Sequence, residues 1–262
     1  MGILNVTPDS FSDGGRLGDV ETAVKAGIQM VMDGADILDV GGESTRPGSD
    51  PVSVEEERDR VVPVIRRLRS EVGTPISIDT RKHQVAAAAL EAGAVIVNDV
   101  TAGSDPEMFR IVAESAAGMC LMHMRGEPKT MQQDTRYDDV VGEVHDYLGA
   151  RIQAAVDAGV AWDRLVIDPG LGFGKSPEGN YVLMRRIGDL LDLRRPIVAG
   201  PSRKSFIGKV LGAEVDERLE GTAGAVAWLV AHGAHVVRVH DVKEMTRVVR
   251  VVEAIRSAPE NA

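Results

Sequence analysis

Eight short apolar runs recur along this 262-residue chain, and nearly every run ends in polar or charged residues. They begin at Ile3, Ile37, Ile76, Val95, Leu121, Leu165, Ile197 and Val236. Short runs rich in β-branched residues are typical of strands that are buried on both faces of a parallel sheet. Because segments with helical periodicity separate the runs, the pattern predicts an α/β fold of eight strand–helix units. We therefore expect a (β/α)8 TIM barrel, as a single domain over residues 1–262.

The expected helices begin at capping residues. Asp19 or Thr22 is expected to begin the first helix, and Ser53 caps the second in a capping box. The third is expected from Lys82 to Ala92, where Gly93 ends it. Later helices are expected over 138–158 and from Pro177, Asp216 and Val242. In such a barrel the carboxyl ends of all strands meet on one face, so the active site is expected there.

Charge and composition exclude several classes of partner. The formal net charge is -10 and the sequence pI is about 5.1, which argues against nucleic-acid binding. No apolar run approaches the ~20 residues of a membrane span, and the first residues do not have the pattern of a signal peptide. The single cysteine, Cys120, has no intramolecular disulfide partner. We therefore expect a cytoplasmic protein that contacts neither nucleic acid nor membrane.

Acids and amides directly follow several of the runs. They are Asp79, Asn98, Asp99 and Asp168. Each could cap the next helix, but four of them at strand ends predict a ring that points into one central cavity. Carboxylates accept hydrogen bonds from ring N–H and amino groups, and an amide both donates and accepts. Such a ring is typical of a site for a flat, nitrogen-rich heterocycle.

Cationic side chains follow the second, seventh and eighth runs. They are Arg46, Lys204, Arg238 and His240. Phosphate sites in these barrels often form after strands seven and eight, beside a helix N-terminus, and the segment 200–205 fits that description. Salt bridges to the surplus of acids are the alternative. Arg203 is the weakest member, because it could point away from the cavity and hold the barrel wall.

His123 and a group of three glycines are more typical of structural roles than of catalysis or dinucleotide binding. His123 follows the fifth run alone, which is more typical of a structural histidine than of a catalyst. The glycines at 170, 172 and 174 do not have the spacing of a dinucleotide-binding motif. They predict a tight turn near a planar ligand, with Phe173 stacking on it or forming a wall. No His or Cys spacing indicates a protein-bound zinc ion.

Eight motifs, one at each strand end and in chain order, resemble those of the bacterial dihydropteroate synthases. They are NVTPDSFSDGG, GGESTRPG, SIDT, NDV, LMHM, DPGLGFGK, SRKSFIG and RVHDV. Members of this pterin-binding family are transferases of folate biosynthesis and targets of sulfonamides. The resemblance implies that 6-hydroxymethyl-7,8-dihydropterin pyrophosphate and p-aminobenzoate condense to 7,8-dihydropteroate, releasing pyrophosphate, with Mg²⁺ as cofactor and a homodimer as the assembly.

The resemblance also implies a role for each motif residue. Pterin would contact Asp79, Asn98, Met122, Asp168, Phe173 and Lys204. Pyrophosphate would lie on Asn5, Arg46, Arg238 and His240, with Asn5 as the Mg²⁺ ligand. p-Aminobenzoate would contact Phe11, Thr45, Pro47 and Ser205. The catalytic set would be Asp9, Arg46, Asp79 and Lys204.

The charges favour an SN1-like displacement. Cations stabilise the departing pyrophosphate, the dihydropterin ring delocalises the positive charge, and the neutral arylamine attacks last. Two other functions are alternatives: a pterin-binding methyltransferase that acts on a methylated folate and a corrinoid partner, and a non-catalytic pterin sensor. Neither uses a pyrophosphate site with intact first and second loops.

Overall fold

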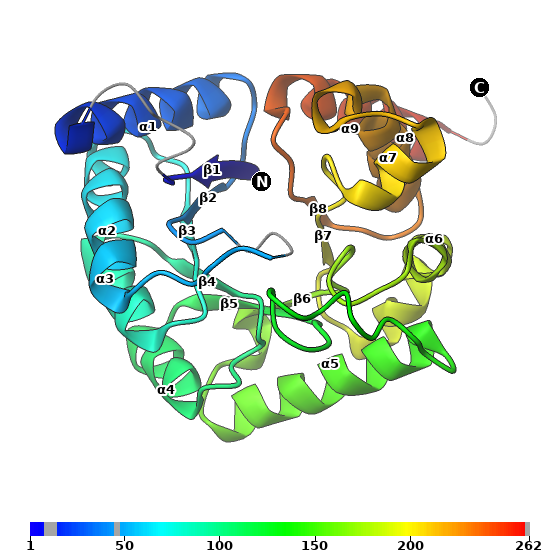
Figure 1. The fold of residues 1–262 in the computed structure, drawn as a ribbon, viewed down its shortest axis with the longest axis horizontal. Coiled ribbons are helices and arrows are strands. Elements are labelled where there is room, and N and C mark those ends of the chain that lie inside the picture. The colour runs from blue at the N-terminus through cyan, green and yellow to red at the C-terminus, as the bar shows by residue number, and fades with distance from the viewer. Residues whose placement is uncertain (8–14, 45–47, 260–262) are drawn as a thin grey trace.

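The computed structural model describes residues 1–7, 15–44 and 48–259, and these form a closed barrel of parallel strands (Figure 1). The strands are β1 (Gly2–Asn5), β2 (Leu38–Gly41), β3 (Ile76–Asp79), β4 (Ile96–Asp99), β5 (Gly118–Met122), β6 (Leu165–Asp168), β7 (Val198–Ala199) and β8 (Val236–Val237). Strands β1 to β6 pair in sequence order, and β7 pairs with β8. Parallel bridges from Gly2 to Val239 and from Ile167 to Ile197 close the cylinder. The predicted (β/α)8 barrel is confirmed.

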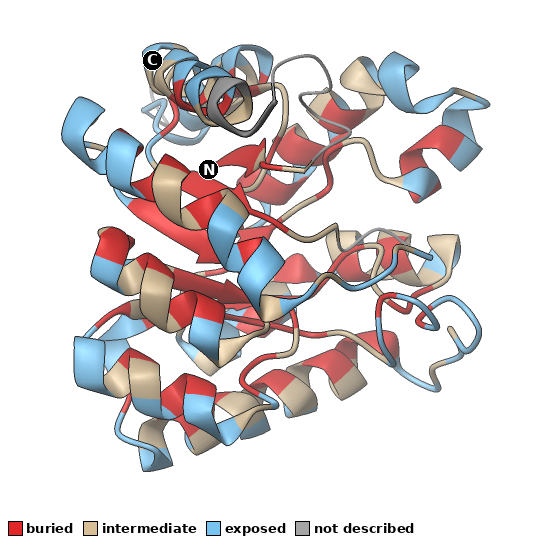
Figure 2. Cartoon of the chain, turned by 60° about the vertical axis from the view of Figure 1, so that its left-hand side comes forward, coloured by how far each residue is buried: buried red, intermediate tan, exposed pale blue. Residues whose placement is uncertain are grey.

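Helices surround the strands, with their buried sides inward and their exposed sides outward (Figure 2). They are α1 (Gly15–Met32), α2 (Val54–Glu71), α3 (His83–Ala92), α4 (Pro106–Ser115), α5 (Val140–Asp157), α6 (Pro177–Arg185), α7 (Ser205–Leu211), α8 (Leu219–Ala231) and α9 (Val242–Arg256). Short 3₁₀ helices are η2 (Trp162–Arg164), η3 (Ile187–Leu193) and η4 (Val215–Glu217). Among the described residues, no helix is both long and apolar enough to cross a membrane.

Several predicted helix ends are confirmed by their capping geometry. Ser53 Oγ accepts a hydrogen bond from the Glu56 N–H at 3.1 Å, which satisfies a donor at the start of α2. Gly93 ends α3 with a φ of 116°, a conformation that favours glycine. The predicted starts at Pro177 and Val242 are also correct.

Three predicted boundaries are wrong. Helix α1 begins at Gly15, before either expected residue. Asp216 lies in η4, and α8 begins three residues later, at Leu219. The fifth strand begins at Gly118 rather than Leu121, because the pairing with β4 already starts at Gly118.

Apolar helix faces hold the barrel together. On α2, Val61, Val64, Ile65 and Leu68 are fully buried. Burying one such side chain contributes about 1.5–3 kcal/mol, so this face alone is a large part of the local stability. Gly27 of α1 leaves room for the Leu68 side chain, which a Cβ would meet at 2.8 Å. Close helix packing thus positions the strands, and the strand ends position the site.

Candidate active site

Four side chains from four strand segments form one hydrogen-bonded network, which we call the arginine-centred cluster: Asp39 within β2, Asp79 and Asn98 at the ends of β3 and β4, and Arg238 directly after β8. Arg238 Nε donates to Asp39 Oδ2 at 2.6 Å, and Arg238 Nη2 donates to Asp79 Oδ2 at 2.5 Å. Asn98 Nδ2 also donates to Asp39 Oδ2, at 3.0 Å. The structure thus brings three predicted site residues together, around an aspartate that the sequence reasoning missed.

The register of the sheet explains why these groups meet. Asp79 of β3 is paired with Gly41 of β2 and with Asn98 of β4. Adjacent parallel strands therefore carry the carboxylate and the amide to the same edge. The missed residue, Asp39, lies inside the apolar run from Ile37, and a charge in the middle of a buried strand was the signal for it.

Burial perturbs the acids of the site. Desolvation raises the pKa of Asp79 to about 7, against the opposing effect of the Arg238 guanidinium. Asp168 ends β6, and burial raises its pKa as well. Its Oδ1 accepts from the Gly170 N–H at 2.7 Å, and the nearby charge of Lys204 favours the ionised form. Raised carboxyl pKa values at one barrel end are consistent with a functional site, but the partners of each carboxyl group decide its role.

Lys204 and Phe173 form one wall of the site. Lys204 directly precedes α7, and its Nζ lies 4.0 Å from the centroid of the Phe173 ring. Burial and the Arg238 charge lower the pKa of Lys204 to about 8. Met122, the last residue of β5, is buried and is paired with Asp168. The Lys204 ammonium group thus lies over an aromatic ring and also acts on the Asp168 carboxyl group, whose strand partner is Met122.

A second network, the lysine-centred cluster, lies behind this wall and consists of His123, Gly170, Phe173 and Lys175. Lys175 Nζ donates to the carbonyl oxygens of Gly170 and Phe173, both at 2.9 Å. It also lies 2.9 Å from His123 Nδ1. Burial lowers the pKa of Lys175 to about 7 and that of His123 to about 3. His123 is therefore neutral near pH 7, and its Nδ1 belongs to this buried network.

The glycines of the same segment make a tight turn, as predicted. Gly170, Gly172 and Gly174 have φ values of 66°, 83° and 63°. A Cβ on Gly170 would overlap the carbonyl oxygen of His123, and one on Gly172 would meet the Lys204 side chain at 3.0 Å. Glycine is required here because the backbone passes directly against the wall of the site.

Asp99 does not belong to the ring of acceptors, and that prediction is wrong. Successive side chains of a strand point to opposite faces, so Asn98 and Asp99 cannot both face the barrel axis. Asp99 Oδ1 accepts from the N–H and the hydroxyl of Thr101, and Oδ2 accepts from the Gly103 N–H, each at 2.8 Å. Its carboxyl group holds the turn after β4.

The predicted phosphate residues lie at neighbouring strand ends. His240 Nδ1 is 2.9 Å from Ser202 Oγ, which also accepts from the His240 N–H. Arg203 instead forms a bidentate pair with Asp241, as expected if it holds the barrel wall. Asn5 ends β1, and Ser205 is the exposed first residue of α7. Five other predicted residues lie outside the described part of the chain: Asp9, Phe11, Thr45, Arg46 and Pro47.

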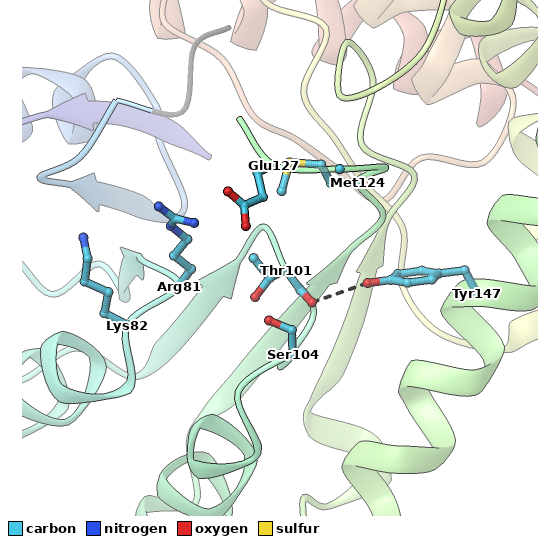
Figure 3. A pocket seen from close by; sticks show the side chains of 8 residues that line it. Arg81, Lys82, Thr101, Ser104, Met124, Glu127 and Tyr147 are labelled. Carbon is cyan, nitrogen blue, oxygen red and sulfur yellow. Dashed lines mark hydrogen bonds between the residues drawn. The ribbon is translucent and has the colours of Figure 1, made fainter. Parts of the chain in front are cut away.

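A cavity of about 450 Å³ opens beside the site, between the loops that follow β3, β4 and β5 (Figure 3). Its lining residues are Arg81, Lys82, Thr101, Ser104, Met124, Gly126, Glu127 and Tyr147. Both of its cationic side chains already pair with Glu43. None of the predicted pterin or phosphate residues lines this cavity.

Comparison with known proteins identifies the class. The family described as pterin binding enzyme matches residues 1–240, and a barrel whose mouth joins carboxylates, an amide and cations suits that class. The dihydropteroate synthase of Escherichia coli is 47% identical over 261 residues, covering 100% of this chain and 93% of the relative. The chain belongs to the dihydropteroate synthase family of pterin-binding enzymes, which are transferases.

Solved structures agree with that assignment. The Xanthomonas albilineans dihydropteroate synthase with 4-aminobenzoic acid is 46% identical, with a TM-score of 0.93 over 99% of this chain and 93% of that one. The Yersinia pestis enzyme with a sulfonamide drug complex is 41% identical, with a TM-score of 0.94, covering 98% and 94% of the two chains. The predicted family, fold and enzymatic class are confirmed.

Proposed function

We propose that this barrel condenses 6-hydroxymethyl-7,8-dihydropterin pyrophosphate with p-aminobenzoate by an SN1-like displacement. The observation that carries the proposal is the meeting of acceptors and cations in one network, in which Arg238 contacts Asp79 and Asp39. Solved relatives that bind 4-aminobenzoic acid and 7,8-dihydropteroate support this choice of substrate and product over the methyltransferase and the sensor.

The pterin is assigned to the acceptor side of the mouth. Asp79 and Asp168 would accept hydrogen bonds from ring N–H and amino groups, and Asn98 would complete the edge. Phe173 and Met122 provide apolar walls for the flat ring. Because these side chains are held on strand ends and a glycine turn, the pocket is preorganised for one planar ligand.

The pyrophosphate is assigned to the cationic side. Arg238 uses Nε and Nη2 within its cluster, while Nη1 makes no hydrogen bond to any described residue and is available to phosphate oxygens. His240 lies beside Ser202 at the next loop, and Arg46 is the further cation proposed. Positive groups placed where charge develops on the leaving group would lower the barrier to C–O cleavage.

The oxygen ligands available at the proposed pyrophosphate site are of the type that Mg²⁺ prefers. Within the described ranges, no group of three or more His, Cys, Asp or Glu side chains could hold a metal ion. Mg²⁺ often binds through one or two protein oxygens together with substrate phosphates, so the Asn5 amide oxygen suits it, with Asp9 nearby in sequence. When bound, the ion would neutralise part of the pyrophosphate charge.

p-Aminobenzoate is assigned to the outer part of the site. Ser205 begins α7, where backbone N–H groups and the helix dipole favour its carboxylate. Phe11, Thr45 and Pro47 would complete the pocket, and the first two loops would exclude water from the cation formed on the pterin. The arylamine is neutral at pH 7, so the mechanism does not require a strong general base.

Pyrophosphate release tests the proposed reaction. We expect release only when both substrates are present, with 7,8-dihydropteroate formed in equal amount. Calorimetry should also detect p-aminobenzoate binding only after pyrophosphate or the pterin pyrophosphate has bound. Turnover with a methylated folate and a corrinoid protein, or pterin binding without any turnover, would contradict the proposal in favour of the methyltransferase or the sensor.

A homodimer in the cytoplasm is the assembly that we propose. Large apolar side chains are exposed on α7, at Val210 and Leu211, and on α9, at Val251 and Ile255. Helices α7, α8 and α9 lie side by side on one flank of the barrel (Figure 1). A second copy would remove this apolar surface from water. Light scattering should give twice the chain mass of 28.0 kDa, and Val251→Lys should shift it to the monomer.

A further inference from the structure

Asp39 is a buried carboxylate in the middle of a barrel strand, and its two hydrogen-bond donors belong to Arg238 and Asn98. Its exposed fraction is 0%, and its partners in the sheet are Ile3 of β1 and Ser77 of β3. Asp39 Oδ2 accepts two hydrogen bonds, from Arg238 Nε and from Asn98 Nδ2. An ionised carboxylate is costly to bury without partners, so its two donors hold it in place and it holds them.

The contact with Asn98 decides which way that amide faces. An ionised carboxylate only accepts hydrogen bonds, so the Asn98 group beside it must be the NH₂ group. The carbonyl oxygen Oδ1 of Asn98 is then turned away from Asp39, and it receives no hydrogen bond from any described residue. Without Asp39 the amide could rotate by 180°, which would exchange an acceptor for a donor at the edge of the site.

The contact with Arg238 fixes the guanidinium in the same way. Its Nε is bound to Asp39 and its Nη2 to Asp79, so the planar group is clamped between carboxylates from two adjacent strands. Because the guanidinium group is planar, these two contacts also fix the direction in which Nη1 points. A guanidinium held by one carboxylate alone would keep rotational freedom that binding would have to remove.

We propose that Asp39 is a positioning residue that sets the orientation of Asn98 for the pterin and of Arg238 for the pyrophosphate. Through one carboxylate oxygen, Asp39 thus orients both the residue that contacts the pterin half of the substrate and the residue that contacts its pyrophosphate half. This inference rests on the proposed roles of Asn98 and Arg238 in substrate binding. It adds that their geometry depends on a residue that contacts neither pterin nor phosphate.

A purely structural role is the competing explanation, and Asp99 provides the matched control. Both aspartates are fully buried, Asp39 on β2 and Asp99 on β4, the two strands that flank β3, and both accept from nearby donors. Asp99 points away from the mouth and only holds the turn at Thr101 and Gly103. A loss of folding stability alone should affect the two positions alike, whereas positioning should be specific to Asp39.

The experiment compares Asp39→Asn with Asp99→Asn in the full chain. We expect Asp39→Asn to raise the KM for 6-hydroxymethyl-7,8-dihydropterin pyrophosphate roughly 10- to 100-fold, as the loss of a supporting partner commonly does. Its KM for p-aminobenzoate at saturating pterin substrate should change by less than about 3-fold. Asp99→Asn should lower the Tm and leave both KM values close to wild type. Equal kinetic effects of the two variants, or an unchanged pterin KM in Asp39→Asn, would overturn the inference.

A double-mutant cycle separates this inference from the proposed function. If Asp39 acts through the amide, Asp39→Asn should weaken binding of 6-hydroxymethylpterin much less in an Asn98→Ala background than in the wild type. If Asn98→Ala by itself leaves pterin binding unchanged, the proposed pterin site fails. If Asn98→Ala weakens binding and the two effects add fully, only the role of Asp39 fails.

Neutron diffraction on the wild-type protein keeps the test independent of how the variants fold. The expected density places the two amide deuterons on the Asn98 atom that faces Asp39. Density with the Asn98 carbonyl oxygen toward Asp39 would overturn the inference, whatever the variants show.

Discussion

The arginine-centred and lysine-centred clusters are both buried polar networks at the same end of the barrel, but they differ in the hydrogen bonds that they leave unused. The Lys175 ammonium group uses its three donors within the protein, on two backbone carbonyl oxygens and on His123 Nδ1. In the arginine-centred cluster, Arg238 Nη1 and Asn98 Oδ1 make no hydrogen bond within the described residues. An ammonium group whose donors are all used inside the protein can only hold structure, whereas donors and acceptors that are left over can also bind a ligand.

The same difference explains why a perturbed pKa is not by itself a sign of chemistry. Burial lowers the pKa of Lys175 to about 7 and that of Lys204 to about 8, so the two lysines look alike electrostatically. Their surroundings differ, because Lys204 lies over the Phe173 ring at the mouth and Lys175 lies behind it. The position of each lysine and the partners of its ammonium group, and not its pKa, therefore distinguish a binding residue from a structural one.

The largest expected effect comes from exchanging each lysine for methionine. Lys204→Met should reduce kcat/KM by roughly 10³-fold, since it removes a charge placed at the substrate, while the Tm changes little. Lys175→Met should lower the free energy of unfolding by about 3 kcal/mol, because buried carbonyl oxygens lose their donor. Steady-state kinetics and denaturant melts measure both. If Lys204→Met mainly loses stability, or keeps wild-type kcat/KM, the claim that Lys204 acts on the substrate while Lys175 holds structure is wrong.

A second prediction concerns the turn that the lysine-centred cluster supports. Gly170→Ala should lower the free energy of unfolding by about 3 kcal/mol, because φ is 66° and the Cβ would overlap the His123 carbonyl oxygen. Gly212→Ala is the matched control, with a φ of 63° but no atom within 4 Å, and should cost only about 1 kcal/mol. Equal losses would mean that backbone strain, and not close approach, decides the cost.

A third prediction uses the raised pKa of Asp79. The carboxylate is the form that accepts from the pterin, so affinity for 6-hydroxymethylpterin should fall about tenfold per pH unit below the pKa of about 7. The folded state also binds this proton more tightly than the unfolded chain does. The free energy of unfolding should therefore decrease as the pH rises from 3.8 to about 7.

Calorimetry with 6-hydroxymethylpterin, which carries no phosphate group of its own to titrate, measures the binding half of this prediction. Asp79→Asn is the control, because its affinity should be weak and should have lost the part of the pH dependence that Asp79 contributes. A wild-type affinity that stays constant down to about pH 5 would show that Arg238 keeps the Asp79 carboxyl group ionised.

The smallest effect is expected for an ion pair that belongs to neither cluster. Arg203 is bound to Asp241, and its side chain is 37% exposed. Solvent weakens such a pair, so Arg203→Ala should lower the free energy of unfolding by about 1 kcal/mol or less and leave kcat/KM within about twofold. A larger kinetic loss, seen in the pyrophosphate-release assay, would assign this arginine to the substrate site.

The strand ends were predictable because each depends on a local pattern. A run of apolar residues followed by Asp79, Asn98 or Asp168 indicates both a buried strand and a polar residue at its end. The same pattern could not tell Asn98 from Asp99, since it does not specify which of two adjacent side chains faces the axis. Asp39 was missed because it interrupts an apolar run without following one.

The sequence by itself determined the barrel, the face that carries the site and the family, because periodicity and motif order are properties of the chain taken in order. Only the tertiary structure decided which charges meet. Arg238 is separated from Asp39 by 199 positions and from Asp79 by 159, and no local pattern links them. Closing the cylinder through β1 and β8 brings these groups into contact, so their pairing, and the direction of the donors left over, is a consequence of the fold.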